Sequence, residues 1–365
     1  MKEGMTFLFR GSFSDPIQAR TWKEGRRSQA NAETMDASEL KLVVVSLYAN
    51  PLLSNDMHES IRRQIRHFQH WIQTHPNWVH ARSSKEAQTA LAQGKRVAVL
   101  SIEGASGLFD HDADLKEWID EAGVRIITLL HLTDDLYGGV ALLPGMSAIA
   151  SPGGLLAAFF RGTRDPESGV RINPRGLHTP GQQFAERLLN AGVWIDLSHA
   201  SDRAQEALIA LHRKHQKPLL YTHTVLRETL HAERGLSLSQ LKALQELGGF
   251  VGLMPSHNYL KNTPISEDTP ECEQDLARFK WQWDTLSSQL GSNHVALGTD
   301  TNGAIPHLKT CEPGGYRHIG QLPQLWKDLK TSGPTDSTLQ EFLTLWAQAE
   351  QTRAHANPHA PEPEP

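Results

Sequence analysis

The stretch VWIDLSHASD, residues 193–202, decides how this chain folds and what it holds. Its first three residues are an apolar run typical of a buried strand, and Asp196, Ser198 and His199 follow with no turn residue between. Buried polar groups need partners. A carboxylate, a hydroxyl and an imidazole at this point therefore indicate that the strand end opens onto a site.

Six further runs share this apolar, β-branched character, and amphipathic helical stretches separate most of them. The predicted strands cover residues 42–48, 96–102, 125–131, 193–199, 218–223, 250–255 and 295–300. Alternation of helices with almost continuously apolar strands indicates a parallel sheet covered by helices. A (β/α)8 barrel needs one strand more. We therefore expect an α/β, TIM-barrel-like fold in which one strand is missing.

Length, charge and cysteine content narrow the class of protein. With 365 residues, 39% of them hydrophobic, the chain suffices for one large domain, placed at residues 1–345. A net charge of −5 without blocks of like charge argues against a nucleic-acid or anionic-membrane partner. Cys272 and Cys311 lack CxxC spacing and are expected to be free thiols. No apolar run approaches the roughly 20 residues of a membrane span and no signal peptide is present, so a cytoplasmic location is expected.

Two segments depart from the alternation of strands and helices. Residues 138–181 are rich in Gly, Pro and Arg, and a segment of this length is expected to form a mobile cover over the active site, with one short helix. Residues 346–365 end in HANPHAPEPEP and are expected to form a Pro-rich disordered tail.

Ionisable side chains stand at the ends of several predicted strands: Glu103, His131, His199, His223 and Asp300. In a (β/α)8 barrel the C-terminal strand ends form the mouth where chemistry takes place. One histidine at a strand end is more often structural, but carboxylates gathered at one place need a cation or a shared proton. Two imidazoles with a carboxylate suit Zn²⁺ that keeps water in an open position. The strand ends therefore predict a zinc site.

The chain resembles the renal or membrane dipeptidase family, peptidase family M19, in blocks that follow one another in the same order: SIEG, LLHLTDD, GLHTPGQQFAERLLNAGVWIDLSHAS, PLLYTHT, HAERGLS and VALGTDTNG. The resemblance spans about residues 40–335, and the order of the blocks makes it specific. It implies a (β/α)8 metallohydrolase that carries two zinc ions and cleaves dipeptides.

The resemblance also implies a set of metal ligands. Glu103 matches the carboxylate that bridges both metals, and His199 and His223 match the imidazole ligands of one of them. Asp300 matches the acidic residue after the last strand, beside the other metal and placed for proton transfer.

Two further residues match groups that meet the substrate. His131 matches the catalytic histidine that contacts the scissile group, and Arg234 matches the arginine that holds the free carboxylate of the substrate. Three departures from the family pattern are expected to alter substrate fit and to leave the metal centre intact: Gly235 in place of Asn, Asn302 in place of an acid, and His178 in place of Thr.

A larger departure lies at the start of the chain. The family opens with a strand that ends in Asp-x-His-x-Asp and binds the first metal, and no such motif precedes residue 40. The similar letters FDHDAD at 109–114 follow Glu103 and lead into a helix, which is the wrong element. Either the start is truncated or misassigned, or the first strand was truly lost; we favour the former, because the downstream ligands are all present, and expect one retained zinc in the chain as given.

The resulting prediction is a zinc-dependent dipeptidase in which a metal-bound hydroxide attacks the peptide bond. Two alternatives stay open. One is another amidohydrolase-like metallohydrolase, acting on a cyclic amide or an acylated amino acid. The other is an inactive homologue that keeps one metal. A dipeptide is the expected partner, a homodimer is left open, and the sequence does not fix the preferred substrate side chains.

Overall fold

The computed structural model describes residues 30, 32–49, 54, 56–143, 152–301, 306–311, 315–331 and 333–351. Its strands are β1 (Leu42–Leu47), β2 (Trp78–His80), β3 (Arg96–Glu103), β4 (Val124–Thr128), β5 (Trp194–Asp196), β6 (Leu219–Thr224), β7 (Gly249–Leu253) and β8 (Val295–Leu297). Its longer helices are α4 (Met57–Thr74), α5 (Ser84–Ala92), α8 (Pro152–Arg161), α9 (Thr179–Asn190), α10 (Asp202–His215), α12 (Leu238–Leu247), α14 (Gln274–Leu290), α15 (Leu322–Leu329) and α16 (Asp336–Glu350). Shorter helical segments are α3 (Ala32–Ala37), α6 (Asp112–Leu115), the π-helix η2 (Lys116–Glu121), α11 (Arg227–Leu230), α13 (His257–Leu260), and the 3-10 turns η3 (Glu271–Glu273), η4 (Ser292–His294) and η5 (Ile319–Gln321).

The strands form one parallel sheet in the order β1-β3-β4-β5-β6-β7-β8. Each of the seven predicted strands is present, and the α/β, TIM-barrel-like class is confirmed. The short strand β2 was not predicted. It pairs with the first residues of β3, while β4 pairs with the last ones. The predicted lack of a first strand concerns mainly residues 1–29, which lie outside the described residues, and it stays a prediction.

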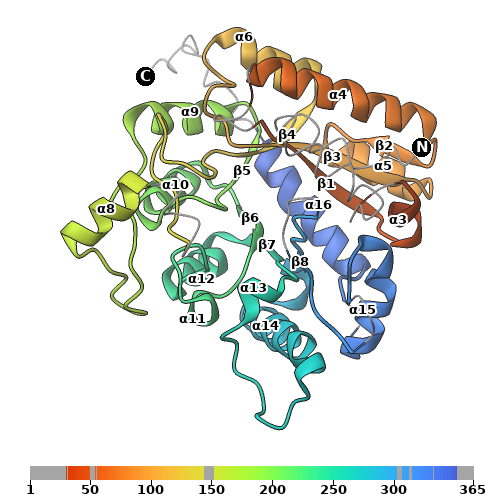
Figure 1. The fold of residues 1–365 in the computed structure, drawn as a ribbon. Helices are drawn as coiled ribbons and strands as arrows, with labels where there is room; N and C mark the ends of the chain where they lie inside the picture. Colours follow the sequence, from red (N-terminus) through yellow and green to blue (C-terminus); the bar gives the residue numbers. More distant parts are fainter. Residues whose placement is uncertain are drawn as a thin grey trace, which may run out of the picture.

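Both faces of the curled sheet are buried, as the apolar runs predict. In β3, Leu100 and Ile102 belong to the core shared with the outer helices, whereas Val97 and Val99 point to the opposite face. That inner face packs on α16, whose Trp346 is fully buried. Figure 1 shows α16 lying across the strands while α4, α9, α10, α12 and α14 surround them. The sheet is therefore a rigid frame whose strand ends can position side chains.

Two predictions about the C-terminal part of the chain are wrong. Residues 346–350 continue α16 and pack in the core, so the predicted tail begins too early; residues 352–365 lie outside the described residues. Cys272 and Cys311 form a disulfide, with 4.6 Å between their Cα atoms. Their spacing gave no signal, because the fold brings η3 beside the segment that follows β8. Among the described residues, no helix has the length and apolarity needed to cross a membrane.

Candidate active site

Ionisable side chains converge at the C-terminal ends of β3, β4, β5 and β6. Glu103 ends β3 and His223 lies near the end of β6, while His131 and His199 follow β4 and β5 by three residues each. The Oε1 atom of Glu103 lies 3.2 Å from Nε2 of His199, 3.4 Å from Nε2 of His223 and 3.6 Å from Nε2 of His131. The structure thus brings together four of the residues singled out in the sequence.

Three of these residues could hold a metal ion. Ligand atoms of Glu103, His199 and His223 all lie within 4.8 Å of one another, and this set is the candidate cluster within the described part of the chain. The Nε2 atoms of the two histidines are 2.8 Å apart. A carboxylate oxygen and two imidazole nitrogens are a donor set that suits Zn²⁺.

Burial shifts the protonation of this cluster. Burial, then the nearby carboxylates of Asp300 and Asp196, raise the pKa of Glu103 well above its usual value. Burial and the cationic Arg234 lower the pKa of His199 and of His223 well below the usual value for histidine. A neutral imidazole keeps a lone pair that can bind a metal ion. A buried carboxylate beside other carboxylates is stabilised in its ionised form by a bound cation. The residues therefore fit a divalent ion.

Asp300 follows β8 by three residues and contributes to the electrostatics of the cluster, although it is not one of the three converging ligands. Burial raises its pKa to about 7, against the opposing influence of Arg234. Both Asp300 (φ 45°) and His199 (φ 68°) have the left-handed backbone conformation that L-residues seldom adopt. The chain thus turns sharply at both positions immediately after a strand.

Asp196, the carboxylate of the opening stretch, has a structural role that sequence reasoning missed. It is almost fully buried, and its Oδ2 accepts hydrogen bonds from the hydroxyls of Thr128 (2.7 Å) and Thr222 (2.6 Å). Its Oδ1 accepts from the backbone N–H groups of Ser198 (3.0 Å) and Thr222 (2.9 Å). Asp196 therefore ties the ends of β4, β5 and β6 together. This matters because Asp196↔Leu220 is the single backbone register pair between β5 and β6.

His131 and Arg234, the residues assigned to the substrate, lie against the cluster. Burial, then the charges of His223 and Arg234, lower the pKa of His131 to about 3, so this imidazole is neutral. Within the described residues, Nδ1 of His131 and Nε of Arg234 are buried without a hydrogen-bond partner. The other end of the guanidinium donates from Nη2 to the carbonyl oxygen of His223 at 3.0 Å. Both side chains therefore keep hydrogen-bonding capacity for a bound molecule.

Two tyrosines join the site without any signal in the sequence motifs. Tyr48 packs edge-on against His131, with ring centroids 4.5 Å apart, and burial followed by the charge of Glu103 raises its pKa. Tyr259, on α13, is close enough to Asp300 and Glu103 that their charges help to raise its pKa, after burial. Tyr48 ends the predicted strand 42–48 but has only apolar neighbours in the sequence, and Tyr259 stands at no predicted strand end, which explains why both were missed.

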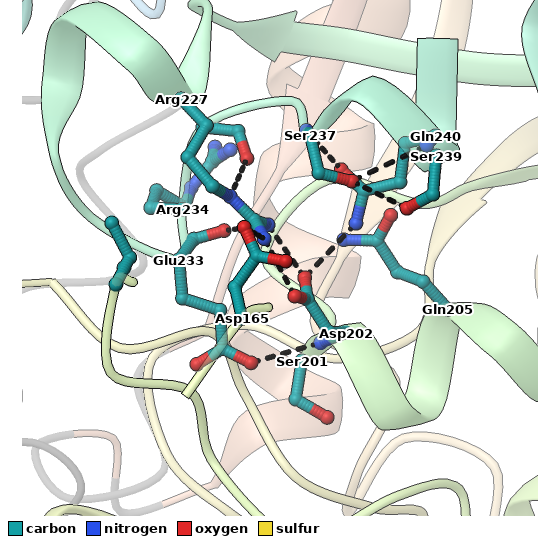
Figure 2. A network of polar contacts seen from close by, with 12 residues as sticks. Asp165, Ser201, Asp202, Gln205, Arg227, Glu233, Arg234, Ser237, Ser239 and Gln240 are labelled. Carbon is teal, nitrogen blue, oxygen red and sulfur yellow. Dashed lines mark hydrogen bonds and ion pairs between the residues drawn. The ribbon is translucent and has the colours of Figure 1, made fainter. Parts of the chain in front are cut away.

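Arg227 fixes the loop that carries Arg234 (Figure 2). This guanidinium is 1% exposed and makes paired hydrogen bonds of 2.6 Å to the carboxylate of Asp202 on α10. It also donates to the carbonyl oxygens of Glu233 (2.9 Å) and Gly235 (3.0 Å), which flank Arg234 on either side. Bidentate contacts of this kind fix orientation as well as distance. Arg227 was not predicted, because it acts on the loop through backbone carbonyl oxygens, which leave no side-chain pattern in the sequence.

Gly235, one of the departures from the family pattern, meets a steric requirement of the fold. A Cβ atom at this position would lie 2.6 Å from Cα of Arg227 and 2.8 Å from its backbone nitrogen. Only glycine allows the two backbone segments to approach so closely. The close approach in turn lets Arg227 reach the carbonyl oxygen of Gly235.

Glu233 connects the same loop to the long segment at 138–181. It is fully buried, and its carboxylate accepts hydrogen bonds from the backbone N–H groups of Leu142 (2.8 Å), Asn173 (2.8 Å) and Asp202 (2.9 Å). Leu142 precedes α8 and Asn173 follows it, so the side chain of Glu233 binds the backbone on both sides of this helix. The segment also passes the cluster, since Ala141 donates its N–H to the carbonyl oxygen of His199 at 2.7 Å.

Comparisons with known proteins show similarity in sequence and in fold. The family model described as membrane dipeptidase (peptidase family M19) matches residues 5–158 and 157–358. Dipeptidase verJ of Clonostachys rogersoniana is 20% identical over 351 residues, 93% of this chain and 79% of the relative. A metallo peptidase from Rhodobacter sphaeroides, liganded with a phosphinate mimic of the dipeptide L-Ala-D-Ala, has a TM-score of 0.65 at 17% identity, covering 93% of this chain and 98% of its own. The probable dipeptidase PvdM from Pseudomonas aeruginosa has a TM-score of 0.65 at 19% identity, covering 88% and 89%.

Proposed function

Because the chain belongs to the membrane dipeptidase family, peptidase family M19, we propose that it hydrolyses dipeptides with zinc held by Glu103, His199 and His223. The observation that carries this proposal is the convergence of these three side chains, with their ligand atoms within 4.8 Å of one another, at the strand ends. A bound zinc would polarise the substrate carbonyl and lower the pKa of a water molecule toward neutrality. One zinc per chain is the expected stoichiometry.

Arg234 restricts the substrate to a short peptide with a free C-terminus. Its buried Nε lacks a partner among the described residues, and a guanidinium binds a carboxylate through paired hydrogen bonds. A longer peptide would place an amide where Arg234 needs a charged group. The Rhodobacter sphaeroides relative is liganded with a dipeptide mimic, and we extend that substrate class to this chain.

His131 and Asp300 take the catalytic roles. The neutral imidazole of His131 can donate one N–H to the carbonyl oxygen of the scissile bond, where negative charge develops. The carboxyl group of Asp300, whose pKa is raised to about 7, can accept and return a proton near neutral pH. It would thus move a proton to the leaving amine. Asp300 is also the residue through which a second metal ion would be held.

Three further expectations from the sequence stay predictions. One is that the segment 138–181 covers the site. Another is the homodimer that the sequence leaves open. The third is a cytoplasmic location, and the Cys272–Cys311 disulfide argues against it, because cytosolic thiols are kept reduced.

Purified full-length chain, loaded with Zn²⁺, tests the proposal against the two alternatives. We expect bound zinc by elemental analysis and release of amino acids from dipeptides, but little release from the same dipeptides with an amidated C-terminus. Arg234→Met should raise KM for the free dipeptide and remove this discrimination. Equal hydrolysis of free and amidated substrates would refute the carboxylate clamp and favour another amidohydrolase-like activity. Bound zinc without any turnover would favour an inactive homologue.

A further inference from the structure

Beyond its contacts with the strand ends, Asp196 reaches one of the candidate metal ligands through a single hydroxyl. The Oγ1 atom of Thr222 lies 2.6 Å from Oδ2 of Asp196 and 2.8 Å from Nδ1 of the neighbouring His223. A threonine hydroxyl has one proton and therefore donates one hydrogen bond at a time. The direction of the chain Asp196–Thr222–His223 follows from which acceptor takes that proton.

The surroundings of Asp196 settle the direction. Its Oδ1 already accepts from two backbone N–H groups, of Ser198 and Thr222, and its Oδ2 accepts from the hydroxyl of Thr128. An ionised carboxylate only accepts. If Thr222 donated to His223 instead, its oxygen would face Oδ2 of Asp196 at 2.6 Å with no proton between them. Thr222 therefore donates to Asp196.

A hydroxyl that donates to Asp196 can only accept from His223. We infer that Thr222, backed by Asp196, holds the proton of His223 on Nδ1 and so keeps the lone pair of Nε2 directed at the metal site. This inference rests on the proposed metal site only for its use, since the hydrogen bonds are made by the chain's own residues. Nε2 of His223 is the atom 3.4 Å from Oε1 of Glu103 and 2.8 Å from Nε2 of His199.

The role of Thr222 is that of a positioning residue. A histidine with its proton on Nε2 must first exchange it before that atom can bind a cation, whereas the Nδ1–H form is ready to bind. A hydrogen bond from the far nitrogen also fixes the plane of the ring and makes the ligand more basic. The same Asp196 side chain thus serves both the sheet and the metal ligand.

The direct test is the tautomer of His223 in metal-free protein. Histidine-labelled ¹⁵N protein distinguishes the two tautomers by the chemical shifts and proton couplings of the ring nitrogens, and His223→Gln identifies the signals of this ring by their loss. We expect the Nδ1–H form in the wild type, and the variant serves only to identify the signals of this ring. A wild-type ring with its proton on Nε2 would overturn the inference.

Two valine variants separate positioning from simple packing. Thr222→Val and Thr128→Val each remove a hydroxyl that donates to Oδ2 of Asp196, but only Thr222 touches His223. We expect Thr222→Val to shift the tautomer and to weaken Zn²⁺ binding about 10–100-fold, measured by competition with a chromophoric chelator. Thr128→Val should leave the tautomer unchanged and bind Zn²⁺ close to wild type, and Thr222→Ser should restore both readouts.

The outcomes distinguish this inference from the proposed function. Equal losses of zinc affinity in the two valine variants, with an unchanged tautomer, would show that the hydroxyl matters only for packing and would overturn the inference. If the wild type bound no zinc, the proposed metal site would fail. The tautomer of His223 in the metal-free chain would still decide the inference on its own.

Discussion

The unfolding free energy should depend on pH through the buried side chain of Glu233, and the sign and size of this dependence follow from burial. This side chain is fully buried, and burial, then the charge of Asp202, raise its pKa from 4.5 to about 8, despite hydrogen bonds from backbone N–H groups. The folded chain therefore keeps the proton over a pH range in which the unfolded chain has lost it. Stability from this group is fully present below about pH 4.5 and is lost as the pH rises through about 8.

Glu233→Gln removes the titration while keeping the shape of the side chain. The side-chain NH2 group of the glutamine must then face a backbone N–H group that donates to the carboxylate in the wild type. This unsatisfied contact lowers the unfolding free energy by about 1–3 kcal/mol at low pH. Between the unfolded pKa of 4.5 and the folded pKa of about 8, the unfolding free energy of the wild type relative to the variant falls by about 1.4 kcal/mol per pH unit, to a total of about 5 kcal/mol. Between about pH 5.5 and 7.5 the stability of wild type relative to the variant should fall by about 3 kcal/mol.

Urea unfolding of both proteins at several pH values measures this difference, and the other titrating groups cancel from it. Glu246→Gln is the matched control. Glu246 is exposed, and its hydrogen bond with Arg213 lowers its pKa, so its contribution is constant above the usual pKa of a glutamate. A constant difference between wild type and Glu233→Gln across this range would show that Glu233 is ionised in the fold and that the reasoning from burial is wrong.

Three further predictions concern the same frame. Arg227→Met should lower the unfolding free energy by about 3–5 kcal/mol, since it removes the cationic partner of Asp202 and leaves that carboxylate only the amide of Gln240. It should also raise KM more than it lowers kcat. An unchanged KM in steady-state assays would contradict a role for Arg227 in holding the Arg234 loop, and a Met substitution at the exposed Arg213 is the control. Reducing the disulfide, which spans 39 residues, should cost at most about 4 kcal/mol in urea unfolding, and free thiols in unreduced, denatured protein would disprove the bond. In hydrogen exchange, the amides of Leu142 and Asn173 should exchange more slowly than those of α8, because both donate hydrogen bonds to the buried carboxylate of Glu233. Equally fast exchange along 138–143 and 152–181 would instead support the wholly mobile cover expected from the sequence.

The sequence predicted the features that repeat along the chain. Each strand longer than three residues is built on a largely apolar run, interrupted inside the strand by single residues such as Ser46, Ser101 and Arg125, and such runs are recognisable without a fold. The converging side chains at 103, 131, 199 and 223 were found because each stands directly at or after such a run. β2 escaped notice because Trp78–His80 is only three residues long.

The remaining features depend on pairs of residues that are distant in sequence. Asp196 was quoted as part of the site, but its partners Thr128 and Thr222 are 68 and 26 residues away. Glu233 likewise binds the backbone of Leu142, 91 residues earlier, and no side-chain pattern marks a residue that uses only its N–H. The pairing of Cys272 with Cys311 belongs to the same class. Such contacts follow from the folded arrangement and have no local signature.

The left-handed backbone at His199 places a limit on how this protein can be stabilised. An L-residue in that conformation costs roughly 1–2 kcal/mol, and glycine adopts it freely. Substitution of His199 by glycine would therefore relieve the backbone strain, but it would also remove an imidazole from the site. The same holds more weakly at Asp300, because aspartate tolerates this conformation better. Selection for heat resistance alone would draw both positions toward glycine. At these two turns the residue that would relax the backbone and the residue that the proposed site uses are therefore different.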